Sequence, residues 1–353
     1  MTTALMTARD ASPEILGTQV PPLAEREPKA GAPIDAKEAY RRFSEREPGI
    51  PIYSRGWWLD AVAGPDAWDV ALVRKGDDIR ATLPYVIRRR YGLTVLGQPP
   101  LTQNLGPWLD VQRAKPAARM ADEKELMQAL IDRLPAFDHF AQNWHYGRTN
   151  WLPFYWNGFK QTTRYCYLLT GLISPQRIWS GFHHNARNEC HKALQRHRLR
   201  VRSDLPIDVF LKLNRRTFER QGMDVPYSDE LVRRLDAACA QRGCRKTFIA
   251  TDPDGRPYAG VYVVWDENGA YALMSGADPA LRNSGAASLC FWEAVRHAAG
   301  FTARFDFGGS MMEPVEHFFR GFGAHQVPYF CVSKTPSLLL RARQSVLGEW
   351  NGA

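Results

Sequence analysis

The stretch from Ala303 to Ala324, with the sequence ARFDFGGSMMEPVEHFFRGFGA, constrains the fold more than any other part of the chain. Its first residues alternate as in a β-strand, with Phe305 and Phe307 on one side and Asp306 on the other. Two glycines follow and are expected to interrupt the strand. This stretch therefore predicts a strand that ends in a tight glycine turn.

A short amphipathic helix is expected after the glycines. Ser310 and Glu313 predict a capping box, in which the two side chains bind free backbone N–H groups at the helix start. Gly323 is of the residue type that commonly ends a helix, and a second strand is expected from Gln326 to Ser333. The apolar face has helical spacing and consists of Val315, Phe318, Phe319 and Phe322.

The same order of elements occurs earlier in the chain. Phe154 stands four residues before Gly158, as Phe319 stands four before Gly323, and an aromatic residue follows each glycine by seven positions. A helix and a strand are expected before each set. We interpret the two sets as copies of one unit, with a chance similarity as the alternative because few letters match.

Three antiparallel strands are expected in the second half of the chain, at Lys246–Thr251, Tyr258–Trp265 and Ala270–Ser275. Asp-Gly and Asn-Gly turns separate them, and such turns are strong hairpin signals. A helix is expected to begin at Ser284, ahead of the strand that contains Asp306. The order is three antiparallel strands, helix, strand, helix, strand.

With this order, and with its FDFGG strand end and FFRGFGA helix end, the chain resembles the GNAT superfamily of acyltransferases. Within it, the FemAB-like branch and its BioF-like acetyltransferase domain are the most similar. The resemblance covers most of the chain after about Ala36 and implies an α+β fold of tandem GNAT-like (acyl-CoA N-acyltransferase) domains, each a mixed, mainly antiparallel sheet flanked by helices. We expect a disordered segment at 1–34, rich in Pro, Ala, Thr and charge, then domains at 35–172 and 173–345.

A basic linker at 177–202 is expected to be helical over much of its length. It carries seven Lys or Arg residues against one acid, Glu189. Its histidines predict no metal site, because neighbours on a helix do not converge as ligands. In the family the corresponding segment begins the catalytic domain and has an RN…KA pattern. By this resemblance, Arg187 and Lys192 are expected to bind the substrate. The alternative is an ordinary solvated helix.

The resemblance also implies a cofactor site at the start of the Ser284 helix. The family signature there is Arg or Gln, two residues, Gly, one residue, then Gly or Ala. A pyrophosphate would bind the free N–H groups of the helix, and small residues let the backbone approach it closely. The alternative is an ordinary helix start with Ser284 as its cap. The matching residues are Arg282, Asn283, Ser284, Gly285, Ala286 and Ala287.

Asp306 is the candidate catalytic residue, as a general base that takes a proton from the attacking amine. The equal alternative is a carboxylate that caps the Ser310 turn or pairs with an arginine. The family's usual general acid is a tyrosine four residues before the closing glycine, where this chain has Phe319. Tyr329 and His317 are substitutes to consider, although each is more typical of a packing or surface residue.

Composition limits the partners and the compartment. The chain has 353 residues and a formal charge of +9, which favours an anionic partner such as a CoA-type cofactor, a nucleotide-linked sugar, tRNA or a membrane surface. The six cysteines lack CxxC spacing and predict free thiols in a reducing compartment. We expect a cytoplasmic protein without a signal peptide or membrane span, with no DNA partner and with peripheral membrane contact left open.

By resemblance, the function expected is transfer of an acyl group, acetyl in the first instance, from acyl-CoA to an amino group, without a metal. An amino sugar of a cell-envelope polysaccharide or peptidoglycan precursor, on a nucleotide or lipid carrier, is the leading acceptor. A Fem-type transferase that uses aminoacyl-tRNA is one alternative, but no long heptad-like helix pair is found for the helical hairpin that such enzymes insert. A GNAT-like protein that only binds an envelope precursor is another.

Overall fold

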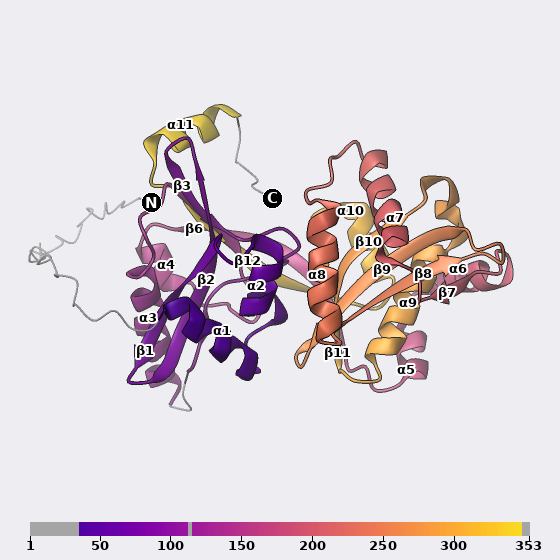
Figure 1. The fold of residues 1–353 in the computed structure, drawn as a ribbon. Helices are drawn as coiled ribbons and strands as arrows, with labels where there is room; N and C mark the ends of the chain where they lie inside the picture. Colours follow the sequence, from indigo (N-terminus) through magenta and orange to yellow (C-terminus); the bar gives the residue numbers. More distant parts are fainter. Residues whose placement is uncertain (1–34, 112–114, 348–353) are drawn as a thin grey trace, which may run out of the picture. The chain divides into compact units, whose positions relative to one another are not determined.

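The structure is a computed structural model that describes residues 35–111 and 115–347. The segment 1–34, predicted to be disordered, lies outside the described residues. Two halves follow one another in the chain, an N-terminal half from α1 to β6 and a C-terminal half from α5 to β12 (Figure 1). The N-terminal half contains α1 (Ala36–Arg46), η1 (Ile52–Ser54), α2 (Gly56–Ala63), β1 (Trp68–Lys75), β2 (Asp78–Arg90), β3 (Leu93–Gly97), β4 (Trp108–Leu109), α3 (Pro116–Ile131), β5 (His139–Asn143), α4 (Leu152–Trp156) and β6 (Lys160–Thr170).

The C-terminal half begins with two helices in place of the single linker helix expected at 177–202, because Phe182 ends the first with extended backbone. Its elements are α5 (Pro175–Gly181), α6 (His184–Gln195), β7 (Arg200–Arg202), α7 (Ile207–Arg220), α8 (Asp229–Gln241), β8 (Arg245–Thr251), β9 (Pro257–Asp266), β10 (Gly269–Ala277), η2 (Pro279–Ser284), α9 (Ala286–Ala298), β11 (Arg304–Gly309), α10 (Glu313–Arg320) and β12 (His325–Lys334). Helix α11 (Leu338–Leu347) follows.

The repeat expected from the sequence is confirmed by the pairing of the strands. In each half, two helices precede three antiparallel strands, and the third strand pairs in parallel with the strand after the next helix, β3 with β5 and β10 with β11. Each half then adds a short helix, a glycine with positive φ (Gly158 at 77°, Gly323 at 74°) and a last strand. The fold is α+β with a mainly antiparallel sheet, as expected.

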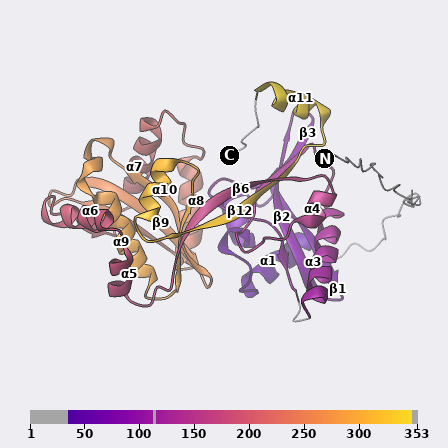
Figure 2. The same cartoon turned by 180° about the vertical axis from the view of Figure 1, so that it is seen from behind.

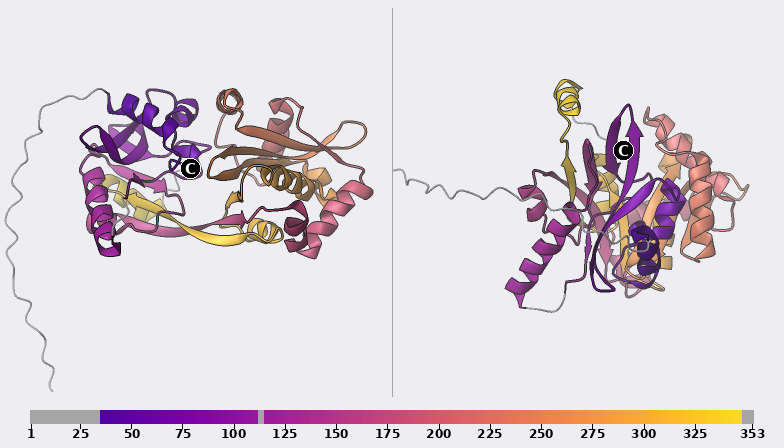
Figure 3. Two further views of the ribbon diagram at one scale, coloured as in Figure 1. Left: turned by 90° about the horizontal axis from the view of Figure 1, so that it is seen from below. Right: turned by 60° about the vertical axis from the view of Figure 1, so that its left-hand side comes forward.

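The two expected sheets form one continuous sheet, because the halves exchange their last strands. Strand β12 pairs with β5 of the N-terminal half, with Cys331 opposite Asn143, and β6 pairs with β11 of the C-terminal half, with Leu168 opposite Asp306. The two exchanged strands also pair with each other, and Figure 2 and Figure 3 show them side by side. The order across the sheet is β1-β2-β3-β5-β12-β6-β11-β10-β9-β8-β7.

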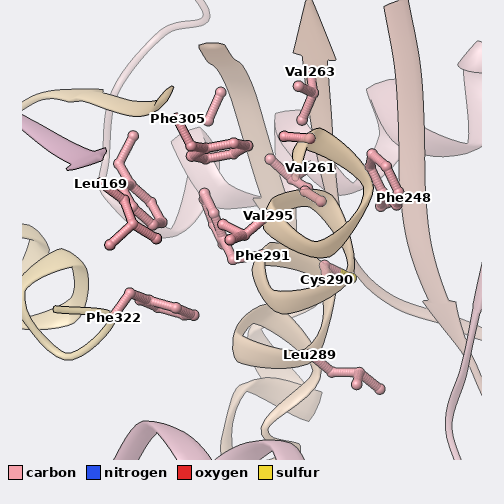
Figure 4. Packing of buried hydrophobic residues seen from close by; sticks show 14 of the residues in the cluster. Leu169, Phe248, Val261, Val263, Leu289, Cys290, Phe291, Val295, Phe305 and Phe322 are labelled. Atoms are coloured by element: carbon pink, nitrogen blue, oxygen red, sulfur yellow. The ribbon is translucent and has the colours of Figure 1, made fainter. Parts of the chain in front are cut away.

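Aromatic rings fill the core between β11 and the helices α9 and α10. Figure 4 shows Phe291 of α9 beside Phe305 of β11 and Phe322 at the end of α10. The ring of Phe307 lies 4.9 Å from that of Phe305 and 5.4 Å from that of Phe322. Because side chains two residues apart on a strand leave the same face, the rings of Phe305 and Phe307 both belong to this core.

Strand β11 bulges at the two glycines, which do not end the strand as expected. Strand β11 runs through Gly309, and its register against β6 shifts between Asp306 and Gly309, with Gly308 at a φ of 85°. The predicted capping box is wrong for the same reason. Helix α10 starts only at Glu313, and the Ser310 hydroxyl accepts from the Met312 N–H, 3.1 Å away.

Among the described residues, no helix combines the length and apolar character needed to cross a membrane.

Candidate functional site

Strands β10 and β11 separate after a very short contact, and this separation organises the candidate site. They pair in parallel only where Ala270 faces Phe305 and Tyr271 faces Asp306. Beyond Tyr271 a bulge shifts the register of β10 against β9, and the N–H and C=O groups on the β11 side of β10 have no strand partner within the described chain. Such an open strand edge offers backbone donors and acceptors to a ligand.

A side chain from the N-terminal half lies at the point where the strands part. Gln103, on the loop between β3 and β4, donates from Nε2 to the Ala272 carbonyl oxygen of β10 at 2.9 Å. A Cβ atom on Gly308 would lie 3.1 Å from the same Nε2. Gln103 therefore closes one end of the gap between β10 and β11, and both halves contribute to the site.

The start of α9 carries the residues expected to bind a pyrophosphate. No side chain caps the helix at its Gly285 start, and the Ser284 hydroxyl accepts only from the Ala286 N–H, at 3.3 Å. Arg282 and Asn283 are exposed, whereas Ser284, Gly285 and Ala286 are buried. Among the described residues, Arg282 makes no ion pair or hydrogen bond. An uncapped helix start beside an exposed arginine fits an anionic group.

Helix α6 covers part of this helix start. A Cβ atom on Gly285 would lie 2.0 Å from the Glu189 carbonyl oxygen of α6. Close packing of two helices is therefore sufficient to explain the glycine, with its φ of 78°, apart from any phosphate. The fit to a diphosphate thus rests on Arg282, Asn283 and the uncapped N–H groups rather than on Gly285.

The packing of α6 also brings the two expected substrate-binding residues to this side of the molecule. Lys192 pairs with Glu189 at 2.6 Å, and Arg187 donates to the Ser180 carbonyl oxygen at 3.1 Å. Both side chains are half-buried. The structure therefore places them on the helix that touches η2 and the start of α9, and gives each a partner within the protein.

Asp306 lies on the face of β11 opposite to the α9 core and is only 2% exposed. Its Oδ1 accepts from the Gly308 N–H at 2.8 Å, and it forms no ion pair within the described chain. Burial raises the pKa of Asp306 to about 7, although the Gly308 hydrogen bond and the positive charge of Arg304 oppose this rise. A carboxyl group with a pKa near neutrality is suited to proton transfer. It does not cap the Ser310 turn or form the arginine pair of the alternative interpretation.

Two tyrosines from different halves enclose the region of Asp306. The rings of Tyr53, from η1, and Tyr271, from β10, lie 5.3 Å apart, and both residues are fully buried. Burial raises the pKa of both phenols well above the ordinary value, and the negative charge of Asp306 adds to this. The Tyr53 hydroxyl has no hydrogen-bond partner among the described residues. An unpaired buried hydroxyl is costly and marks a strained part of the core.

The N-terminal half lacks an equivalent carboxylate. Phe140 faces Leu96 in the parallel pair of that half as Phe305 faces Ala270, so Ala141 occupies the position that corresponds to Asp306. The candidate chemistry therefore belongs to the C-terminal half.

The position of the family's usual general acid holds a core residue. Phe319 is 8% exposed and packs 5.3 Å from the Phe307 ring. Of the two substitutes considered, His317 is exposed and contacts Arg320, whereas Tyr329 is half-buried with its hydroxyl 3.1 Å from where a Cβ of Gly309 would lie. Tyr329 thus lies against the end of β11, and His317 does not.

No group of three or more His, Cys, Asp or Glu residues in the described ranges is arranged to hold a metal ion. Two surface hollows, of about 700 Å³ beside α1 and β1–β2 and about 510 Å³ beside α2 and the β9–β10 turn, contain none of the predicted site residues. No disulfide joins any two of the described cysteines.

The sequence alone missed the contribution of the N-terminal half to the site. Gln103 lies in the stretch LTQNLGPWLD, whose composition indicates burial without a regular helix or strand. That pattern was the sequence feature that could have pointed to this loop. Tyr53 sits just before a helix and carries no pattern that sets it apart.

Comparisons with known proteins agree with this arrangement. Residues 180–320 match the family model described as "Acetyltransferase (GNAT) domain". No curated protein matches the chain. Among solved structures, FemX is similar with a TM-score of 0.61 at 11% identity, covering 89% of this chain and 98% of that one.

Two further structures share the fold at low identity. The L-PGS structure from Bacillus licheniformis has a TM-score of 0.52 at 10% identity, covering 89% of this chain and 96% of that one. The C-terminal domain (DUF2156) of a putative lysylphosphatidylglycerol synthetase from Agrobacterium fabrum has a TM-score of 0.52 at 12% identity, with 89% and 98% covered. The resemblance inferred from the sequence is confirmed: residues 180–320 belong to the acetyltransferase (GNAT) family, and the chain is an N-acyltransferase with a tandem GNAT-like fold.

Proposed function

We propose that the chain transfers an acyl group from acyl-CoA to an amino group of a cell-envelope precursor, with an amino sugar on a nucleotide or lipid carrier as the leading acceptor. The observation that carries this proposal is the parting of β10 and β11 directly after Asp306, in the part of the chain that matches the acetyltransferase model. Such a gap offers an unpaired strand edge on one side and a buried carboxyl group on the other.

In this proposal the chain's own residues have separate roles. Arg282, Asn283 and the first N–H groups of α9 bind the diphosphate of the donor. Asp306 takes the proton of the attacking amine, directly or through one water molecule. The open edge of β10 supplies backbone N–H groups for the negative charge that develops on the carbonyl oxygen. The donor supplies the acyl group as a thioester: the amine nitrogen bonds to the acyl carbon, the carbon–sulfur bond breaks, and CoA leaves as a thiol with the proton that the amine loses.

Thermal unfolding with acetyl-CoA, longer acyl-CoAs and free CoA tests the donor, because a ligand that binds only the folded state raises the unfolding midpoint. We expect acyl-CoA to raise the midpoint of the wild-type chain and of the control Arg119→Glu, an exposed position on α3 with the same change in charge. Arg282→Glu is expected to lose the shift. A shift that persists in Arg282→Glu would show that the diphosphate binds elsewhere, and no shift with any CoA would refute the donor.

An aminoacyl donor is the second candidate, favoured by the fold shared with FemX and with lysylphosphatidylglycerol synthetase. The longest helix within 35–111 and 115–347 is α3, with 16 residues, so the described chain has no long helical hairpin of the kind expected for tRNA binding. Charged tRNA would be tested next if no CoA shifted the midpoint. A scaffold that only binds a precursor would give neither a shift with donors nor acyl transfer.

A further inference from the structure

The loop that follows β5 carries an arginine whose side chain has no hydrogen-bond or ion-pair partner among the described residues. Arg148 is half-buried, and its Nε atom is shielded from solvent without a hydrogen bond. Its guanidinium forms no ion pair or hydrogen bond among the described residues. Three other arginines have a similarly buried Nε, but each of them has a carboxylate within 3.2 Å: Arg55 with Glu267, Arg80 with Asp110 and Arg245 with Asp236.

Burial of an unpaired guanidinium is unfavourable, because the charge loses water without gaining a counter-ion. Burial accordingly lowers the pKa of Arg148, and Glu123 opposes this only at a distance. The Glu123 carboxylate is engaged with another group, the Asn150 Nδ2, at 3.1 Å. The Arg148 guanidinium is therefore available to bind an anion from outside the described chain.

Further groups that bind anions gather around the same loop. Arg304 of β11 donates from Nη1 to the Tyr146 hydroxyl at 2.9 Å and has no carboxylate partner within the described chain. The rings of His145 and Tyr146 lie with centroids 4.1 Å apart and planes tilted by 35°. Burial lowers the pKa of His145 to about 4, and the positive charges of Arg304 and Arg148 add to this. Tyr146 lies between His145 and Arg148 in the loop and bonds Arg304, so both arginines belong to one small region.

This region adjoins the proposed base. Arg304 and Asp306 are two residues apart on one strand, so their side chains leave the same face, with Cα atoms roughly 7 Å apart. The loop with Arg148 comes from the N-terminal half, at the position where the C-terminal half has the β11–α10 loop. An anion held here would be bound by both halves, next to Asp306.

We propose that Arg148 and Arg304, with the Tyr146 hydroxyl, bind an oxyanion of the amine acceptor, a phosphoryl or carboxylate group, and thereby hold the acceptor beside Asp306. The assignment of the anion to the acceptor rests on the proposed function, whereas the anion site itself does not.

The test uses the full chain and inorganic phosphate. At constant ionic strength, replacement of chloride by phosphate is expected to raise the unfolding midpoint of the wild type and of Arg119→Met, the control with the same change in charge. Arg148→Met is expected to lose the part of the rise that the site contributes. Because Arg148→Met also removes an unpaired buried charge, its midpoint in chloride is expected to equal or exceed that of the wild type. A phosphate response in Arg148→Met equal to that of Arg119→Met would overturn the site.

The titration of His145, followed by NMR in the wild-type chain, is independent of any variant. An anion between the two arginines offsets their charge, so the pKa of His145 is expected to rise on addition of phosphate. A pKa that does not move would also overturn the site. Acetate in place of phosphate in the unfolding experiment, at neutral pH where acetate is ionised, separates the two sources: a rise with both anions that Arg148→Met loses indicates a carboxylate-type group, and such a rise with phosphate alone indicates a phosphoryl group.

The acyl-CoA experiment and the phosphate experiment test independent claims, so one claim can be refuted while the other stands. Arg148→Met is expected to retain the acyl-CoA shift that Arg282→Glu loses. If no CoA binds while phosphate still acts through Arg148, the acyl-CoA donor is refuted and the anion site stands.

Discussion

Replacement of Asp306 by asparagine should stabilise the protein at alkaline pH and leave it nearly unchanged in acid. The carboxyl group is buried, and its pKa is raised from 3.8 to about 7. Since the folded state holds the proton more tightly than the unfolded state does, the folded state loses stability as the pH rises from about 4 to about 7. Above that range the full cost of the buried charge is present.

The magnitude follows from the two pKa values. A rise from 3.8 to about 7 corresponds to about 4 kcal/mol, because one pKa unit is worth about 1.4 kcal/mol. This is an upper limit, since local relaxation lowers the cost of a buried charge. Asparagine preserves the Oδ1 acceptor for the Gly308 N–H, so it removes the charge without leaving that donor unpaired.

Urea unfolding followed by tryptophan fluorescence at about pH 4.5 and about pH 8.5 measures the effect. We expect Asp306→Asn to gain up to about 4 kcal/mol at the higher pH and little at the lower pH, while Asp77→Asn, in an exposed turn, changes little at either. An equal change at both pH values would refute a raised pKa. If Asp306 is the base, the stabilised variant loses acyl transfer, a combination typical of strained functional sites.

Three further substitutions test the site and its supports. Gly285→Ala should lower the free energy of unfolding in urea by about 3 kcal/mol or more, because the new Cβ would lie 2.0 Å from the Glu189 carbonyl oxygen and the residue keeps a positive φ. The control Gly92→Ala also has a positive φ but open space around the Cβ, so it should cost only about 1 kcal/mol. Tyr53→Phe removes a buried hydroxyl that lacks a partner and should be neutral or stabilising by about 1 kcal/mol; a loss of more than that would reveal a hydrogen bond. Gln103→Met should cost about 1 kcal/mol by removing the bond to β10, and acyl transfer should fall with it; unchanged activity would exclude Gln103 from the site.

The sequence alone predicted most of the elements, because each is encoded by local patterns. The Asn-Gly and Asp-Gly turns predict the β8–β9–β10 meander, which the structure contains. Helix α1 likewise begins at a local signal, where the Asp35 Oδ1 accepts from the Lys37 N–H at 3.2 Å. The capping box at Ser310 failed, since the local pattern cannot reveal that β11 bulges through Gly309 before the chain turns.

Only the tertiary structure decided which strands of the two copies pair with each other. The spacing around Gly158 and Gly323 showed that a unit repeats, but β6 and β12 carry no signal that each belongs beside the other half. Pairing between distant strands depends on exposed edges and on the packing of whole layers, which no short window of sequence contains.

The candidate site divides in the same way. The sequence singled out Asp306 and the residues from Arg282 to Ala287, because a strand end and a glycine-rich helix start are local features. It did not reveal Gln103 at the gap or the bond from Arg304 to Tyr146 in the loop of Arg148, since these contacts join residues far apart in the chain. Burial and the loss of water change a side chain's charge and reactivity, and the folded chain alone determines which side chains are buried.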